Sequence, residues 1–201
     1  MKMRPATPFH FNGAIIQDAG GIPIDHFCKP FYAGDDKIRQ MVIAGLRTWI
    51  EARRHLLVGR VLDFGCGRPG TCRTPQPYRD LVEGAYVGVD LGDGVPDDEF
   101  NAVLCTEVLA YLKHPRYTIN TLVDRLTPGG HLIVTATSAW PENEADSFWR
   151  FTAAGLTRLG MDACIYAGRG EVLEVGNISS MTVGRLRFAL SNGMVFKKGT
   201  E

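Results

Sequence analysis

Two short segments carry residue types that together suit a nucleoside cofactor. Residues 61–70 run from apolar side chains into a glycine turn, and residues 86–90 are a second apolar run that ends on Asp90. Glycines let a backbone turn sharply and approach a ligand where a Cβ would interfere. A carboxylate after the second strand can accept both hydroxyls of a ribose. The pair therefore predicts a nucleoside-cofactor site at the end of two strands.

The elements that must position these residues follow from the pattern of apolar side chains. Short, nearly continuous apolar runs are typical of strands that are covered on both faces in a parallel sheet. They predict strands at 60–64, 85–90, 102–106 and 131–136, with a further strand at 163–167. Apolar residues at helical spacing predict helices over 35–57, between Leu109 and Leu126, and over 152–159 with Thr152 as N-cap. The segments 186–190 and 194–197, separated by Ser191-Asn192-Gly193, suit a β-hairpin.

This alternation predicts an α/β fold, a doubly wound, Rossmann-like and mostly parallel sheet with helices on both faces. Ligands of such sheets bind outside the carboxyl ends of the strands. The glycine turn, Asp90 and the pair Thr106-Glu107 all follow strands, so we expect them at one edge of the sheet.

Composition narrows the class of protein. The chain has 201 residues, with 22 basic and 22 acidic side chains and a formal net charge of zero at pH 7. This balance gives no support to a nucleic-acid or membrane partner. Five scattered cysteines contain no C-x-x-C pair, so no metal site is expected. We expect reduced thiols and a cytoplasmic location.

The first residues differ in character from the rest. Residues 1–34 combine several prolines and glycines with five aromatic side chains. This composition indicates an irregular segment that packs on the domain or covers a cleft. Residues 35–201 are expected to form one domain.

From residue 60 to residue 159 the chain resembles the class I S-adenosylmethionine-dependent methyltransferases, in particular the small-molecule type. The motifs that carry the resemblance are residues 61–67, 77–81, 86–90, 101–109, 126–134 and 149–156. The resemblance implies the fold above, S-adenosylmethionine as cofactor, and methyl transfer to a small-molecule or sugar-like acceptor. It assigns cofactor contacts to these residues: Asp63, Gly65, Cys66, Gly67, Asp90, Leu91, Cys105, Thr106 and Glu107.

Other residues are candidates for chemistry or for acceptor binding. Glu107 could act as a base, or serve only as a first-turn acid of a helix. Tyr111 could replace a histidine that relatives often carry nearby, or be a buried aromatic. Trp140, Trp149 and Arg150 follow the fourth strand and suit a polar small molecule, although Trp149 could also simply pack at the start of the next helix.

Two departures from the family pattern affect the cofactor site. Only ten residues, 91–100, separate Asp90 from the next strand, where the family has a helix, a strand and an acid that contacts adenine. Because a parallel crossover takes about a dozen residues or more, we expect the usual third strand to be missing. Residues 68–76 look like an insertion, either a solvated loop or an anion-binding segment. The alternative function is a degenerate domain that binds a ligand or a protein without turnover.

Overall fold

A six-stranded sheet with the strand order β4-β3-β5-β6-β8-β7 forms the centre of the molecule. The computed structural model describes residues 10–11, 14–15, 36–67, 76–139, 148–183 and 186–200. Strands β3 to β6 are parallel, and β8 and β7 continue the sheet in antiparallel pairing. Their bounds are β3 Val58–Phe64, β4 Glu83–Val89, β5 Phe100–Thr106, β6 Leu126–Thr137, β7 Gly170–Val183 and β8 Leu186–Lys198. Two short strands, β1 His10–Phe11 and β2 Ala14–Ile15, pair with each other.

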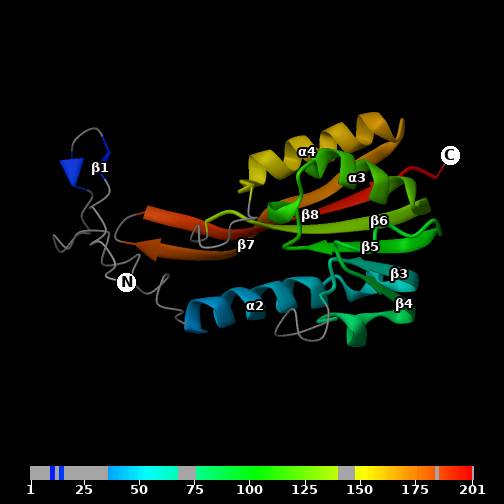
Figure 1. The fold of residues 1–201 in the computed structure, drawn as a ribbon, viewed down its shortest axis with the longest axis horizontal. Helices are drawn as coiled ribbons and strands as arrows, with labels where there is room; N and C mark the ends of the chain where they lie inside the picture. Colours follow the sequence, from blue (N-terminus) through cyan, green and yellow to red (C-terminus); the bar gives the residue numbers. More distant parts are fainter. Residues whose placement is uncertain are drawn as a thin grey trace.

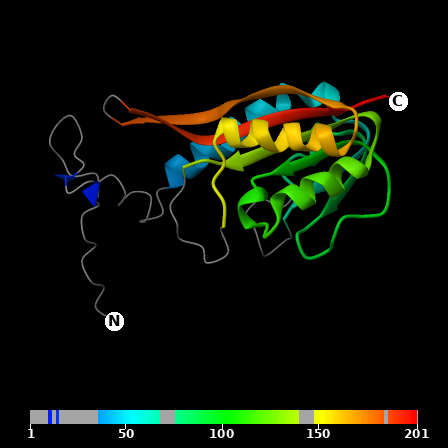
Figure 2. The same cartoon turned by 90° about the horizontal axis from the view of Figure 1, so that it is seen from above.

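Helices cover both faces of this sheet, as Figures 1 and 2 show. Helix α2 (Asp36–Glu51) lies on one face, and α3 (Pro115–Asp124) and α4 (Ala153–Tyr166) lie on the other. Three single 3-10 turns, η1 Arg54–Leu56, η2 Arg79–Leu81 and η3 Leu109–Tyr111, connect the elements. The doubly wound, mostly parallel α/β architecture expected from the sequence is therefore confirmed.

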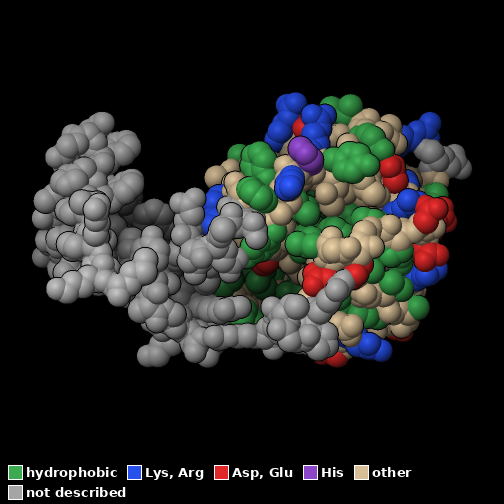
Figure 3. Space-filling model, viewed as in Figure 1, with side chains coloured by type: hydrophobic (Ala, Val, Ile, Leu, Met, Phe, Trp, Pro, Cys, Tyr) green, Lys and Arg blue, Asp and Glu red, His purple; other side chains and the backbone are tan. Residues whose placement is uncertain are grey.

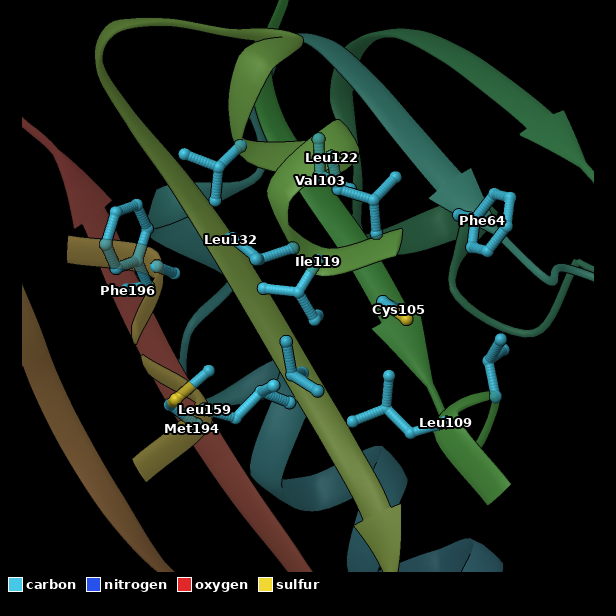
Figure 4. Close-up of a cluster of buried hydrophobic side chains, with 14 of the residues drawn as sticks. Phe64, Val103, Cys105, Leu109, Ile119, Leu122, Leu132, Leu159, Met194 and Phe196 are labelled. Carbon is cyan, nitrogen blue, oxygen red and sulfur yellow. The ribbon is translucent and has the colours of Figure 1, made fainter. Parts of the chain in front are cut away.

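Alternating side chains of the central strands fill a separate apolar layer on each face. On β5, Val103 and Cys105 pack towards α3 and α4, whereas Ala102 and Leu104 pack with Ile50 of α2. Figure 4 shows the layer under α3 and α4, with Phe196 and Met194 of β8 beside Leu132 of β6. A large apolar side chain that is fully buried contributes about 1.5–3 kcal/mol. Burial on both faces explains why these strands are recognisable as continuous apolar runs.

Strand β4 is an edge strand, and the crossover from it to β5 contains no helix or strand. Residues 90–99, all of which the structure describes, therefore connect β4 to β5 as an irregular segment. Within it, Val95 packs on the α3 and α4 side of the sheet together with Val87 and Val89. The carboxylate of Asp98 forms an ion pair with Arg60 at 2.8 Å. The expectation that the usual third strand is missing is confirmed for the part of the chain that the structure describes.

Two expected elements of the last third of the chain are wrong. Residues 163–166, expected to begin a strand, are the last turn of α4, which keeps Leu156, Leu159 and Ala163 on its buried side. Ser191-Asn192-Gly193, expected as a hairpin turn, lies inside β8, where it pairs with residues 135–137 of β6. The hairpin joins β7 and β8, whose paired residues Val183 and Leu186 lie on either side of the connection.

The boundaries of the other helices and strands differ less from those expected from the sequence. The helix expected between Leu109 and Leu126 begins only at Pro115, because proline lacks an amide hydrogen and suits the first helical position. Strand β6 begins at Leu126, earlier than expected, since Leu126 pairs with Phe100 of β5. Thr152 caps α4 as expected, with its hydroxyl accepting a hydrogen bond from the amide of Gly155 at 3.1 Å. The role expected for residues 1–34 falls largely outside the described residues.

Candidate cofactor and acceptor site

The glycine turn after β3 joins the carboxyl ends of β3 and β4. The amides of Gly65 and Cys66 both donate to the carbonyl oxygen of Val89, at 2.8 and 3.1 Å. Gly65 has a φ of +82°, and a Cβ built on it would lie 2.1 Å from Cγ2 of Val108. Gly67 also has a positive φ, of +73°. Glycine at position 65 is therefore required both by backbone conformation and by the packing of the loop after β5.

Asp63, the next-to-last residue of β3, places a fully buried carboxyl group below this turn. Its Oδ2 accepts a hydrogen bond from the Tyr86 hydroxyl at 2.7 Å, while Oδ1 has no partner among the described residues. Burial raises the pKa of Asp63 to about 6, and the hydrogen bond from Tyr86 opposes this rise. A buried acceptor without a partner is costly, so Oδ1 is suited to a donor from a ligand.

Asp90 follows the last residue of β4 and is oriented by the backbone of its own turn. Its Oδ1 accepts from the amide of Leu91 at 2.9 Å, and its own amide donates to Oδ2 of Asp93 at the same distance. The neighbouring Leu91 exposes 39% of its surface. The end of β4 thus presents a carboxylate beside an apolar side chain, a combination that suits a ribose and an aromatic base.

Glu107 holds its carboxylate against β6 and β8. Its backbone has a φ of +56°, unusual for a residue with a side chain, and its amide donates to the carbonyl oxygen of Thr135 at 3.0 Å. Oε2 accepts from the hydroxyl of Thr137 at 2.6 Å, and Oε1 accepts from that of Ser191 at 2.5 Å. Burial raises the pKa of Glu107, and these hydroxyl bonds oppose the rise. Both carboxylate oxygens are therefore already engaged within the protein.

The thiols near the site are sequestered. Burial raises the pKa of Cys66 to about 11, and it also places the pKa of the fully buried Cys105 well above the usual range. Since the thiolate is the reactive form, neither cysteine is equipped to act as a nucleophile near neutral pH. They serve as small apolar groups, and Cys105 belongs to the layer drawn in Figure 4.

The segments that follow β5 and β6 contact each other. The indole nitrogen of Trp149 donates to the carbonyl oxygen of Leu112 at 2.7 Å, and the amide of Phe148 donates to that of Ala110. Trp149 remains 43% exposed, and Tyr111 38%. Arg150 donates from Nη1 to the carbonyl oxygen of Trp149. Trp140 lies outside the described residues, so its expected role stays a prediction.

Two polar residues of β8 lie at this place and were not expected there from the sequence. Besides Ser191, Asn192 is fully buried and donates from Nδ2 to the carbonyl oxygen of Phe151 at 2.9 Å, just before the cap of α4. The sequence has apolar runs on both sides of residues 191–193, and one long strand through these residues explains this pattern as well as a hairpin does. The third residue of this motif, Gly193, lies against the ring of Trp49.

A glycine turn and two carboxylates at the carboxyl edge of a doubly wound sheet define the class of Rossmann-like proteins that bind a nucleoside cofactor. The model of a methyltransferase domain family matches residues 39–156, more than half of the chain. The chain belongs to this family, and it is identified as a class I S-adenosylmethionine-dependent methyltransferase. Its cofactor is accordingly S-adenosylmethionine. A search of curated protein sequences found no match.

Solved structures share the fold at low sequence identity. A chain of the complex between the Haloferax volcanii Trm112 methyltransferase activator and the putative methyltransferase matches with a TM-score of 0.56 and 16% identity, covering 89% of this chain and 96% of that one. A Burkholderia thailandensis 1,6-didemethyltoxoflavin-N1-methyltransferase, with bound 1,6-didemethyltoxoflavin and S-adenosylhomocysteine, matches with a TM-score of 0.52 and 16% identity over 87% and 86%. The [4+2]-cyclase SpnF matches with a TM-score of 0.52 and 18% identity over 79% and 82%.

The residues of the turn fit the cofactor. Oδ1 of Asp63 is a buried acceptor without a partner in the described part of the chain, and the left-handed glycines present backbone rather than side chains at the end of β3. A cation such as an ammonium group satisfies such a carboxylate. None of the described helices is long and apolar enough to span a membrane.

Proposed function

We propose that the protein transfers a methyl group from S-adenosylmethionine to a polar small molecule, which includes sugar-like acceptors. The observation that carries this proposal is the joining of the glycine turn to the end of β4 through the carbonyl oxygen of Val89. This contact brings Asp63 and Asp90 to the same edge of the sheet, as a cofactor with an amino-acid end and a ribose requires.

Each part of this edge has its own role in the proposal. The backbone of residues 65–67 and the free oxygen of Asp63 hold the amino-acid end of the cofactor. The carboxylate of Asp90 accepts the ribose hydroxyls, and Leu91 contacts the base. Cys105 and Thr106 end β5 beneath the reacting centre. The bound cofactor supplies an electrophilic methyl group on a sulfonium.

The protein contributes to the reaction mainly by alignment. Holding an acceptor in line with the methyl and sulfur atoms supplies much of the rate of a displacement. Because both carboxylate oxygens of Glu107 accept hydroxyl bonds, this residue acts in our proposal by holding the loop after β5 in place. Tyr111 is the remaining candidate for proton transfer, and it is needed only for an acceptor that is a poor nucleophile.

The acceptor is proposed to bind among the segments after β5 and β6. Trp149 offers a fixed and partly exposed ring there, and Arg150 and Trp140 are neighbours in sequence. The zero net charge favours a small molecule over a nucleic acid. The Burkholderia neighbour, which holds a small-molecule substrate, supports the same choice of acceptor class.

A second candidate is a domain that binds a ligand without methyl transfer. It is favoured by the helix-free crossover of residues 90–99. The resemblance described above implies that the family's contact with adenine lies in this part of the chain. The cyclase among the structural neighbours illustrates that one fold hosts different functions.

Calorimetry with S-adenosylmethionine tests the cofactor half of the proposal. Asp90→Ala removes charge-assisted hydrogen bonds to the ribose and should weaken binding by about 10- to 100-fold. Glu83→Ala changes an exposed acid at the other end of β4 and should leave the affinity unchanged. Absence of binding at millimolar cofactor, or equal affinity of Asp90→Ala and the unaltered protein, contradicts the proposal.

Turnover separates the two candidates. The protein is incubated with a metabolite extract and S-adenosylmethionine, and products that gain one methyl group are detected by mass spectrometry. A reproducible product that disappears with Asp90→Ala supports the methyltransferase. Cofactor binding without any product supports the binding domain.

A further inference from the structure

We propose that a groove beside the start of α3 is a second ligand site, which takes a planar organic anion such as an aromatic carboxylate. The groove has a volume of about 570 Å³. It is lined by Lys113, His114, Pro115, Arg116, Tyr117, Asn120, Trp149 and Leu159. This size is in the range of pockets that hold small organic ligands. The groove shares Trp149 with the proposed acceptor contacts, but its occupancy does not depend on methyl transfer.

The apolar part of the groove is already in place. Pro115 and Leu159 are buried, and the hydrogen bond from the Trp149 indole to Leu112 fixes the orientation of that ring. Tyr117 contributes a ring that is 74% exposed. Fixed aromatic rings bury a large area at little entropic cost, so these walls suit a flat, apolar ligand body.

The charged part of the groove is basic. Among the residues that the structure describes, its lining includes Lys113, His114 and Arg116 and no carboxylate. The carboxylate of Asp162 is shared between Arg116, at 3.6 Å, and Arg158, at 3.2 Å. One carboxylate thus faces two arginines, and Lys113 adds a further positive charge. Figure 3 shows basic side chains gathered beside hydrophobic ones over α3 and α4, although the whole chain has no net charge.

A further feature of the groove favours an anionic ligand group. Helix α3 starts here without a side-chain cap, since His114 at the N-cap position forms no capping hydrogen bond. Pro115 at the first helical position has no amide hydrogen, so the amides of Arg116 and Tyr117 are the donors of this turn that remain for an anion. An anionic group joined to a flat ring satisfies the basic groups and the aromatic walls at once.

The experiment compares benzoate with benzamide, its neutral counterpart of similar shape, by isothermal titration calorimetry of the full-length protein. We expect benzoate to bind about tenfold more tightly, because only the anion gains from the basic groups. Lys113→Gln, at an exposed position, should weaken benzoate about five- to tenfold and leave benzamide unchanged. Lys197→Gln, on β8 opposite His131 of β6, is the matched control and should have no effect.

The aromatic wall is tested separately. Trp149→Ala should weaken both ligands, and Trp149→Phe should restore most of the affinity because it keeps a ring at this position. Equal affinity for benzoate and benzamide, equal effects of the two lysine variants, or no binding of benzoate at millimolar concentration would overturn the proposal.

Discussion

Asp63 has an ionisable carboxyl group, but its burial in the folded protein disfavours the charged form. Its carboxyl group is fully buried, and only one of its two oxygens has a partner, the hydroxyl of Tyr86. The raised pKa of about 6 means that the folded protein keeps this group protonated at pH values where the unfolded chain, with a pKa near 3.8, ionises it. The free energy of unfolding therefore falls as the pH rises from about 4 to about 6, and it stays lower above that range.

Asp63→Asn is expected to stabilise the cofactor-free protein at alkaline pH. Asparagine keeps an acceptor for Tyr86 but has no charge to bury, so the gain should reach about 3 kcal/mol at about pH 8 and vanish near pH 4. Urea unfolding at both pH values measures it. Asp97→Asn, at an exposed ion pair with Arg125, is the control and should change stability by less than about 1 kcal/mol. A gain of the same size at both pH values would contradict the explanation.

For single residues, the sequence predicted correctly those features that depend on the local backbone conformation. Gly65 and Gly67 were expected in a tight turn, and their positive φ angles confirm it. The engagement of Glu107 by Thr137 and Ser191 could not be predicted, because these residues lie 30 and 84 positions away in the sequence. The sequence shows residue types, whereas such a contact depends on the register of β8 against β6.

Among the elements, strand β8 combines apolar runs with buried polar residues. Apolar residues at both ends flank a polar centre, in which Ser191 and Asn192 are fully buried. Ser191 donates to Glu107, and Asn192 donates to the carbonyl oxygen before α4. The strand thus connects the loop after β5 with the start of α4, and both of these segments adjoin the proposed acceptor site.

Ser191→Ala should destabilise the protein by about 1–3 kcal/mol, because it leaves an oxygen of the Glu107 carboxylate without its donor. Ser179 of β7 is the matched control, since it pairs directly with Ser191 and its hydroxyl has no partner among the described residues. Ser179→Ala should change stability by no more than about 0.5 kcal/mol. Urea denaturation at neutral pH measures both, and equal losses would show that the bond to Glu107 contributes nothing.

How well each helix or strand could be predicted from the sequence depends on how that element is buried. Strands β3, β4, β5 and β6 lie in the middle or on the parallel side of the sheet, and their apolar runs were sufficient to predict them. The end of α4 was mistaken for a strand because Ile165 and Tyr166 are apolar although they are 76% and 51% exposed. Ser191-Asn192-Gly193 has strong local turn preference, but pairing with β6 and buried hydrogen bonds override it.

At the scale of the whole molecule, equal numbers of acidic and basic side chains remove the net repulsion between copies of the protein. Several of these charges are paired on the surface, for example Arg47 with Asp80 and Arg53 with Glu174. The groove at α3 is then a local excess of positive charge on a neutral background.

Self-association should consequently be strongest near neutral pH and weaken about two pH units to either side, because net charge keeps protein molecules apart. Static light scattering at low salt and a fixed protein concentration measures the second virial coefficient across this range. A coefficient that does not change with pH would show that contacts other than balanced charge control association.

The helix-free crossover from β4 to β5 also has a kinetic consequence. Strands β3 and β5 are neighbours in the sheet, for example Val61 with Ala102, and their pairing closes the chain between them into a loop. With residues 90–99 in place of a helix and a further strand, the loop to be closed is shorter and its entropic cost is lower. Shorter sequence separation between contacting residues speeds folding. The loss of family structure next to the cofactor edge therefore favours rapid assembly of the parallel core.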